Sequence, residues 1–215
     1  MTVAAPDDAK WMARALDLAR AQLGRTAPNP SVGCVIVANG EIVGEAATGE
    51  GGRPHAEEAA LAIAGDKAVG ATAYVTLEPC SERSSGTPSC SEHLINASVS
   101  RVVAACLDPH PQGSGGLDRL RAAGVVCEVG VLRDNAEAVN AGFFKVVRDG
   151  RPLVSLDPSA DSYDGEFYLG RGESFEAALA RMAQEGLTRI RVSPSSPLAA
   201  ALKSRGLVDV DRSGA

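Results

Sequence analysis

The sequence T-A-Y-V-T-L-E-P-C at residues 72–80 places an apolar strand directly before a proline and a cysteine. Proline cannot donate a hydrogen bond to a sheet, so the strand ends there with Cys80 at its carboxyl end. Cys90 precedes a helical pattern at residues 91–97, and His55 precedes another at residues 56–64. One imidazole and two thiols therefore stand at the ends of neighbouring elements.

These residue types are zinc ligands. One imidazole and two thiolates give three protein ligands and leave a fourth position free, which is typical of catalytic rather than structural zinc. Glu57 follows His55 by two residues and so points along a different helical face. The pattern H-x-E followed by P-C and a second cysteine is typical of zinc deaminases, with the glutamate as general acid and base. We expect His55, Cys80 and Cys90 to bind Zn²⁺ and Glu57 to be catalytic.

The elements around this pattern predict an α/β fold with a mixed sheet. Asp7 or Asp8 can cap a helix that continues to Leu23, and Asn39-Gly40 favours a tight hairpin turn. After these come alternating strands and helices, which place helices on the faces of a sheet. The expected strands are 32–38, 41–45, 72–77, 99–107 and 125–131. The expected helices are 56–64, 91–97, a short one that ends at residue 123, and 135–147. Residues 1–149 form this first unit.

Residues 150–215 form a smaller segment. A helix at 175–184, a strand at 188–193 and a helix at 198–204 are expected there. With one or two strands the segment has a poor core of its own, so we expect it to lean on the first unit or on a second subunit. A homodimer is therefore left open.

Composition narrows the class of protein. The chain has 215 residues, of which 45% are hydrophobic and 22% charged, as in globular proteins. Its net charge of −6 and its 4% of aromatic residues disfavour a nucleic-acid partner. No apolar stretch or basic leader indicates a membrane span or signal peptide, so a cytoplasmic location is expected. Of five cysteines, Cys34, Cys106 and Cys127 lie in apolar runs and are expected in the core.

Several longer motifs resemble one known family, the bifunctional riboflavin-biosynthesis deaminase/reductases. They occur in order over most of residues 10–150. The motifs are A-P-N-P-S-V-G-C-V-I-V (27–37), G-G-R-P-H-A-E (51–57), T-L-E-P-C-S (76–81), L-D-P-H-P-Q-G-S-G-G-L (107–117) and N-A-G-F-F-K (140–145). The resemblance implies the cytidine-deaminase-like three-layer α/β/α sandwich. It also implies hydrolytic removal of an exocyclic amine from a pyrimidine that carries a ribosyl phosphate.

Carried onto this chain, the resemblance implies that Asn29 binds the pyrimidine ring and that Asp108 lies near the ribose-derived chain. The family's loop between the cysteines reads C-S-H-x-G-[RK]-T-P-P-C, whereas here it reads C-S-E-R-S-S-G-T-P-S-C. Glu82 thus replaces a cation, and Arg83 is the candidate to bind a substrate phosphate in its place. His110 stands where the family has asparagine and is a further candidate for substrate binding.

The carboxyl-terminal segment resembles two pieces of the family's reductase, at 150–165 and 187–210, without most of the nucleotide-binding domain between them. We therefore expect a truncated, non-catalytic remnant that uses no NADPH. The changed loop leaves open a paralogue that deaminates another small amino-pyrimidine or purine. A tRNA-type deaminase is disfavoured by the acidic charge. A non-catalytic zinc module that assembles with a separate reductase is the remaining alternative.

Overall fold

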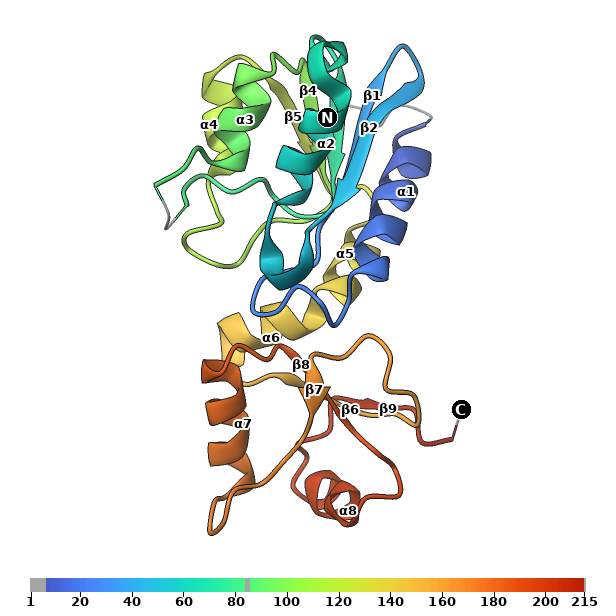
Figure 1. The fold of residues 1–215 in the computed structure, drawn as a ribbon, viewed down its shortest axis with the longest axis vertical. Helices are drawn as coiled ribbons and strands as arrows, with labels where there is room; N and C mark the ends of the chain where they lie inside the picture. Colours follow the sequence, from blue (N-terminus) through green and yellow to red (C-terminus); the bar gives the residue numbers. More distant parts are fainter. Residues whose placement is uncertain (1–6, 84–85, 215) are drawn as a thin grey trace.

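The computed structural model describes residues 7–83 and 86–214, which contain two sheets (Figure 1). The first sheet has the strand order β2-β1-β3-β4-β5. Its strands are β1 (Gly33–Ala38), β2 (Glu41–Ala47), β3 (Thr72–Val75), β4 (Arg101–Ala104) and β5 (Val126–Val129). Strand β1 pairs antiparallel with β2 and β3, while β3, β4 and β5 run parallel. The sheet is therefore mixed, as expected.

Helices cover both faces of this sheet (Figure 1). On one face lie α1 (Asp8–Ala21) and α5 (Arg133–Val139). On the other lie α2 (Ala56–Ala64), α3 (Cys90–Asn96) and α4 (Gly116–Ala122). The expected three-layer α/β/α sandwich is thus confirmed.

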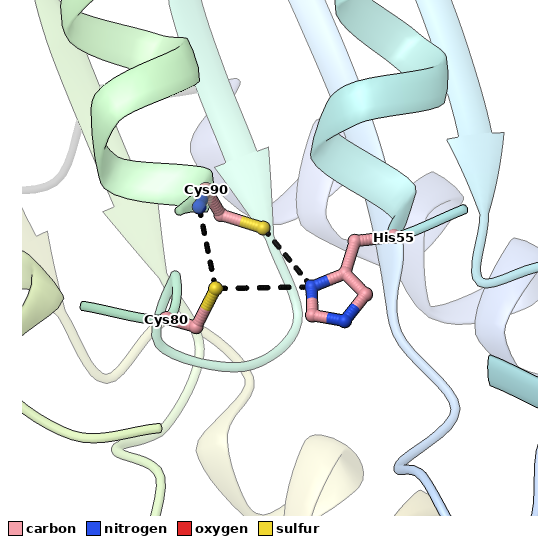
Figure 2. Close-up of side chains that lie close together, drawn as sticks. All are labelled: His55, Cys80 and Cys90. Carbon is pink, nitrogen blue, oxygen red and sulfur yellow. Dashed lines mark hydrogen bonds between the residues drawn. The ribbon is translucent and has the colours of Figure 1, made fainter. Parts of the chain in front are cut away.

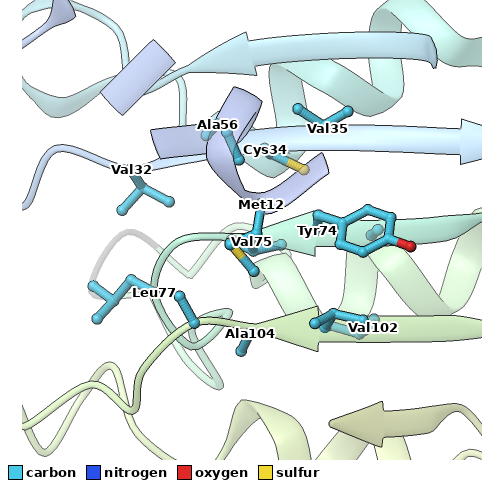
Figure 3. Packing of buried hydrophobic residues seen from close by; sticks show 14 of the residues in the cluster. Met12, Val32, Cys34, Val35, Ala56, Tyr74, Val75, Leu77, Val102 and Ala104 are labelled. Carbon is cyan, nitrogen blue, oxygen red and sulfur yellow. The ribbon is translucent and has the colours of Figure 1, made fainter. Parts of the chain in front are cut away.

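The core lies on both sides of the central strands. Strand β1 is buried along almost its whole length, because a strand between two helical layers has no solvent-facing side. Figure 3 shows Met12 of α1 and Ala56 of α2 beside this strand. Helix α1 approaches β1 so closely that a Cβ on Gly33 would lie 1.9 Å from the carbonyl oxygen of Ala15, so only glycine fits there.

The start of α1 differs from the prediction. Asp7 is the N-cap residue, but its side chain makes no capping hydrogen bond. Asp8 is fully buried and accepts hydrogen bonds from Arg101 at 2.7 and 2.8 Å and from the Tyr74 hydroxyl at 2.8 Å. The ion pair ties α1 to β3 and β4 instead of capping the helix, and Glu128 of β5 extends it through Arg101.

The helix expected at 135–147 is two helices, α5 and α6 (Ala141–Asp149), which meet at Asn140. The buried Asn140 side chain accepts a hydrogen bond from the Ser31 backbone nitrogen (2.9 Å) and donates one to the Ser31 oxygen (3.1 Å). This pairing resembles one rung of a β-ladder, and it fixes the chain at the point where the helix axis changes. The apolar pattern of residues 135–147 continues through Asn140, so it predicts one helix and gives no sign of this break.

The second sheet has the order β7-β8-β6-β9, all parallel. It comprises β6 (Leu153–Leu156), β7 (Gly165–Glu166), β8 (Arg189–Val192) and β9 (Val210–Asp211), with helices α7 (Phe175–Gln184) and α8 (Pro197–Ser204). The expectation of one or two strands was wrong, because β7 and β9 are two residues long and show no periodicity. The sheet and both helices enclose their own apolar cluster, centred on Leu179, Met182, Ile190 and Leu202.

The two parts of the chain are in contact. Arg189 of β8 donates hydrogen bonds to the carbonyl oxygens of Ala138 (3.1 Å) and Val139 (3.3 Å) in α5. The expectation that the carboxyl-terminal segment leans on the first unit therefore agrees with these contacts. Across the described part of the chain, every helix is too short or too polar to cross a membrane.

Candidate metal and active site

The starts of two helices and the loop after one strand bring His55, Cys80 and Cys90 together (Figure 2). His55 is the N-cap residue of α2, and Cys90 is the first residue of α3. Cys80 follows β3 on the loop beyond Pro79. Ser89 and Glu92 form a capping box that fixes the start of α3, so the orientation of Cys90 is set by its helix cap.

The three donor atoms lie within 4.8 Å of one another. Nδ1 of His55 is 3.1 Å from Sγ of Cys90 and 3.8 Å from Sγ of Cys80, so Nδ1 is the nitrogen that faces the sulfurs. The hydrogen bond between the thiols raises the pKa of Cys90 and lowers that of Cys80 to about 3. The donor set and its spacing fit a zinc ion held by three protein ligands.

Glu57 lies in the first turn of α2 and is only 3% exposed. Burial raises the pKa of its carboxyl group, and the charge of Cys80 adds to this, while His55 opposes it. A carboxyl group with a raised pKa binds a proton more firmly than usual, which suits a group that accepts and then returns a proton. Glu57 also lines the same cavity as His55 and Cys80, so a molecule in that cavity can reach it.

A cavity of about 320 Å³ opens in front of these residues. The expected site residues Asn29, Arg83, Asp108 and His110 line it, together with Glu57, His55 and Cys80. These side chains come from four separate parts of the chain and surround one space, which is large enough for a small heterocycle. Cys90 does not line the cavity, although its Sγ lies 3.1 Å from Nδ1 of His55.

Asn29 and Asp108 both line this cavity. The Asn29 amide donates a weak hydrogen bond to the Gly51 oxygen at 3.3 Å. Asp108 follows β4 and accepts a hydrogen bond from the His110 backbone nitrogen at 2.8 Å. Burial raises the pKa of the Asp108 carboxyl group, and this backbone bond opposes the rise. The cavity-facing carboxyl group can therefore accept hydrogen bonds from hydroxyl groups of a bound molecule.

The arginines around the site have different partners. Arg83 is 5% exposed in its side chain and donates to Oε2 of Glu58 at 3.0 Å. Its other terminal nitrogen lies 3.6 Å from Sγ of Cys90. Arg53 is exposed and lies 2.6 Å from Nε2 of His55, on the side of the ring away from the sulfurs. Glu58 is therefore the ion-pair partner of Arg83, although its side chain is 39% exposed.

Glu78 is a buried residue that also lines the cavity. Its buried carboxylate accepts hydrogen bonds from the backbone nitrogens of Gly115 (3.0 Å), Leu117 (3.3 Å) and Asp108 (3.3 Å). It thereby caps α4 and holds the loop that carries Asp108 and His110. At Gly116 a Cβ would lie 1.7 Å from the Pro79 oxygen, so α4 packs directly on the residue before Cys80.

Two contributors to the cavity were not expected from sequence. Phe143 of α6 lines the cavity, with its ring 6.4 Å from that of His110. Asn140, just before it, holds Ser31 and thus the loop that carries Asn29. Both lie in the motif N-A-G-F-F-K (140–145). In the sequence this motif indicated family membership, but no role was assigned to its residues. Among the remaining cysteines, Cys34 and Cys106 are buried in the core as expected, and Cys127 is half-buried.

Comparison with known proteins identifies relatives of this site. The sequence family described as the cytidine and deoxycytidylate deaminase zinc-binding region matches residues 5–106, which include all three donor residues and Glu57. The riboflavin biosynthesis proteins RibD of Haemophilus influenzae and Escherichia coli are each 52% identical over 168 residues. That match covers 78% of this chain and 45% of each relative, so the chain spans less than half the length of these proteins.

Solved structures agree. One structure of Acinetobacter baumannii RibD matches with a TM-score of 0.66 at 44% identity, over 83% of this chain and 50% of that one. A second form of that protein is 34% identical, with a TM-score of 0.66, over 95% of this chain and 69% of that one. A deaminase/reductase of Thermotoga maritima gives a TM-score of 0.67 at 34% identity, over 83% and 52% of the two chains. This chain therefore belongs to the RibD family of riboflavin-biosynthesis deaminase/reductases.

Proposed function

We propose that this chain is a zinc-dependent hydrolytic deaminase, with the diaminopyrimidinone ribosylamino-phosphate of riboflavin biosynthesis as its substrate. The observation that carries the proposal is the placement of the buried Glu57 carboxyl group in the same cavity as the ligand set His55, Cys80 and Cys90. The Thermotoga maritima relative is named a diaminohydroxyphosphoribosylaminopyrimidine deaminase, which supports the choice of substrate.

In this mechanism His55, Cys80 and Cys90 hold the zinc ion. Bound zinc supplies Lewis acidity, which lowers the pKa of a water molecule enough to make it a nucleophile near neutral pH. Glu57 accepts the proton that the attacking water loses as the new carbon–oxygen bond forms. It then donates that proton to the exocyclic nitrogen, the carbon–nitrogen bond breaks, and ammonia leaves. Its raised pKa and its burial suit both steps.

The cavity walls orient the substrate. We assign the ring to Asn29, whose side-chain amide has donor and acceptor capacity left beyond its weak bond to Gly51. Asp108 is assigned to the hydroxyl groups of the ribose-derived chain and His110 to its phosphate end, because both lie on the loop beyond β4 that borders the cavity. Arg83 remains a candidate phosphate ligand from the sequence, although binding there requires it to compete with Glu58.

A different substrate is the second candidate. Glu82, which is exposed, also lines the cavity, and its negative charge disfavours a phosphate nearby. A paralogue that deaminates an uncharged amino-heterocycle would tolerate this residue. The two candidates share the chemistry at Glu57 and differ only in what the outer part of the cavity binds.

We further propose that residues 1–149 carry the whole reaction and that residues 150–215 are non-catalytic and use no NADPH. The family's glycine-rich stretch before the last helix is replaced by Ser193-Pro194-Ser195-Ser196-Pro197, whose side chains keep a pyrophosphate away from the backbone. A cytoplasmic location and a homodimer stay predictions, which cell fractionation and sedimentation measure. Two relatives, from Arabidopsis thaliana and Zea mays, are named chloroplastic, so location varies among the relatives.

The function is tested by measuring ammonia release from the zinc-loaded protein. The panel contains the diaminopyrimidinone ribosylamino-phosphate, its dephosphorylated form, cytidine, deoxycytidylate and adenosine. We expect turnover of the first compound and a higher KM for the second. Preference for the dephosphorylated form supports the paralogue, and no turnover of any compound contradicts both candidates.

A further inference from the structure

Arg83 lies between the two cysteines in sequence and against the second of them in space. Its guanidinium group donates one hydrogen bond to Oε2 of Glu58 at 3.0 Å and contacts Sγ of Cys90 at 3.6 Å. Only 5% of the side chain is exposed. Arg83 thus lines the cavity while its guanidinium group is enclosed beside a metal-ligand sulfur.

A buried arginine must be paired, because an isolated charge in the interior costs several kcal/mol. Here both of the observed partners are anionic or become so: the Glu58 carboxylate and the Cys90 thiolate. Two thiolates and the nearby Glu57 carboxylate together carry one more negative charge than a zinc ion neutralises. A positive group in contact with Cys90 offsets that excess.

The pair also joins three elements. Glu58 belongs to α2, whose N-cap is His55, while Cys90 begins α3. Arg83 belongs to the loop that starts at Cys80. One guanidinium group therefore connects the helix that carries the imidazole to the helix that carries the second sulfur, and a planar fork with fixed directions suits that task better than an ammonium group.

We propose that Arg83 is a positioning residue of the metal site, held by Glu58, which orients Sγ of Cys90 and offsets its charge by an N–H···S hydrogen bond. Outer hydrogen bonds of this kind set the affinity of metal ligands and their electron donation. The inference rests on the proposed zinc site but not on the proposed substrate.

The test measures metal binding in the full-length protein. The variants are Arg83→Met, Arg83→Lys and Glu58→Gln, with Arg121→Met as the matched control. Arg121 of α4 also pairs with a carboxylate, that of Asp118 at 2.7 Å, but on the exposed surface of its helix. Zinc affinity is measured by competition with a chromogenic chelator. Cobalt substitution then reports the sulfur-to-metal charge-transfer bands.

We expect Arg83→Met to weaken zinc binding about 10- to 100-fold and to shift the cobalt charge-transfer bands. Glu58→Gln shifts both in the same direction by less, Arg83→Lys restores part of the affinity, and Arg121→Met leaves both unchanged. Zinc affinity within threefold of wild type in Arg83→Met, with an unchanged cobalt spectrum, overturns the proposal. An inactive protein in the ammonia assay contradicts the proposed function alone, because these metal measurements do not depend on turnover.

Discussion

Nδ1 of His55 lies 3.1 Å from Sγ of Cys90, although 35 positions separate the two residues in the chain. The contact follows from how the fold places helix starts. Helices α2 and α3 pack side by side on one face of the sheet, and each presents its first turn at the edge where β3 ends. The amino end of a helix favours negative charge, so this edge also favours thiolates.

The buried ion pair between Asp8 and Arg101 is expected to contribute strongly to stability. Asp8→Ala leaves part of the Arg101 charge without its buried partner, which costs about 3–5 kcal/mol for such pairs. The exposed pair Arg14–Glu45 is the control, and Glu45→Ala is expected to cost about 1 kcal/mol or less. Urea denaturation at pH 7 measures both. Equal losses for the two variants would show that burial adds nothing here.

Asn140 is expected to control the loop that carries Asn29. In Asn140→Asp the side chain keeps its size, but a carboxylate cannot donate to the Ser31 oxygen and repels it. We expect lower stability by about 1–3 kcal/mol and a raised KM in the deaminase assay, with zinc content unchanged. The control is the same substitution at an exposed position, Asn135→Asp in α5. A variant with wild-type KM would mean that Asn29 does not depend on this anchor.

The ion pairs of Asp209 with Lys145 of α6 and with Arg151 are expected to be sensitive to acid. Burial alone would raise the pKa of the Asp209 carboxyl group. Hydrogen bonds from Arg151, the Val154 nitrogen and Lys145 outweigh that effect, so the pKa lies below its ordinary value. A lowered pKa gives stability that is present above the unfolded value of about 3.9 and is lost as the pH falls through the folded value.

Asp209→Asn should therefore be less stable than wild type at pH 7, and this difference should shrink as the pH falls below about 4. Urea midpoints at both ends of the range measure it, and loss of metal in acid affects both proteins alike. Glu41→Gln, at an exposed strand start, serves as the control. A difference of the same size at every pH would mean that the charge of Asp209 is not what stabilises the contact.

The sequence was most informative where chemistry or a strict pattern constrains it. The donor residues and Glu57 could be named because few residue types bind zinc or shuttle protons, and α2 and α7 were predicted at their observed bounds. The strands of two residues and the break at Asn140 could not be predicted, because both depend on partners distant in sequence. The same holds for Arg83, whose contacts with Glu58 and Cys90 exist only in the folded chain.

The central claim is that Glu57 moves the proton at a zinc site it does not itself ligate. Its most direct test is ammonia release by Glu57→Gln, with zinc content measured in the same sample. The account predicts a loss of turnover of about 10²- to 10⁴-fold with one zinc per chain retained, because the amide can neither accept nor donate that proton. Turnover near that of wild type, with zinc retained, would contradict it.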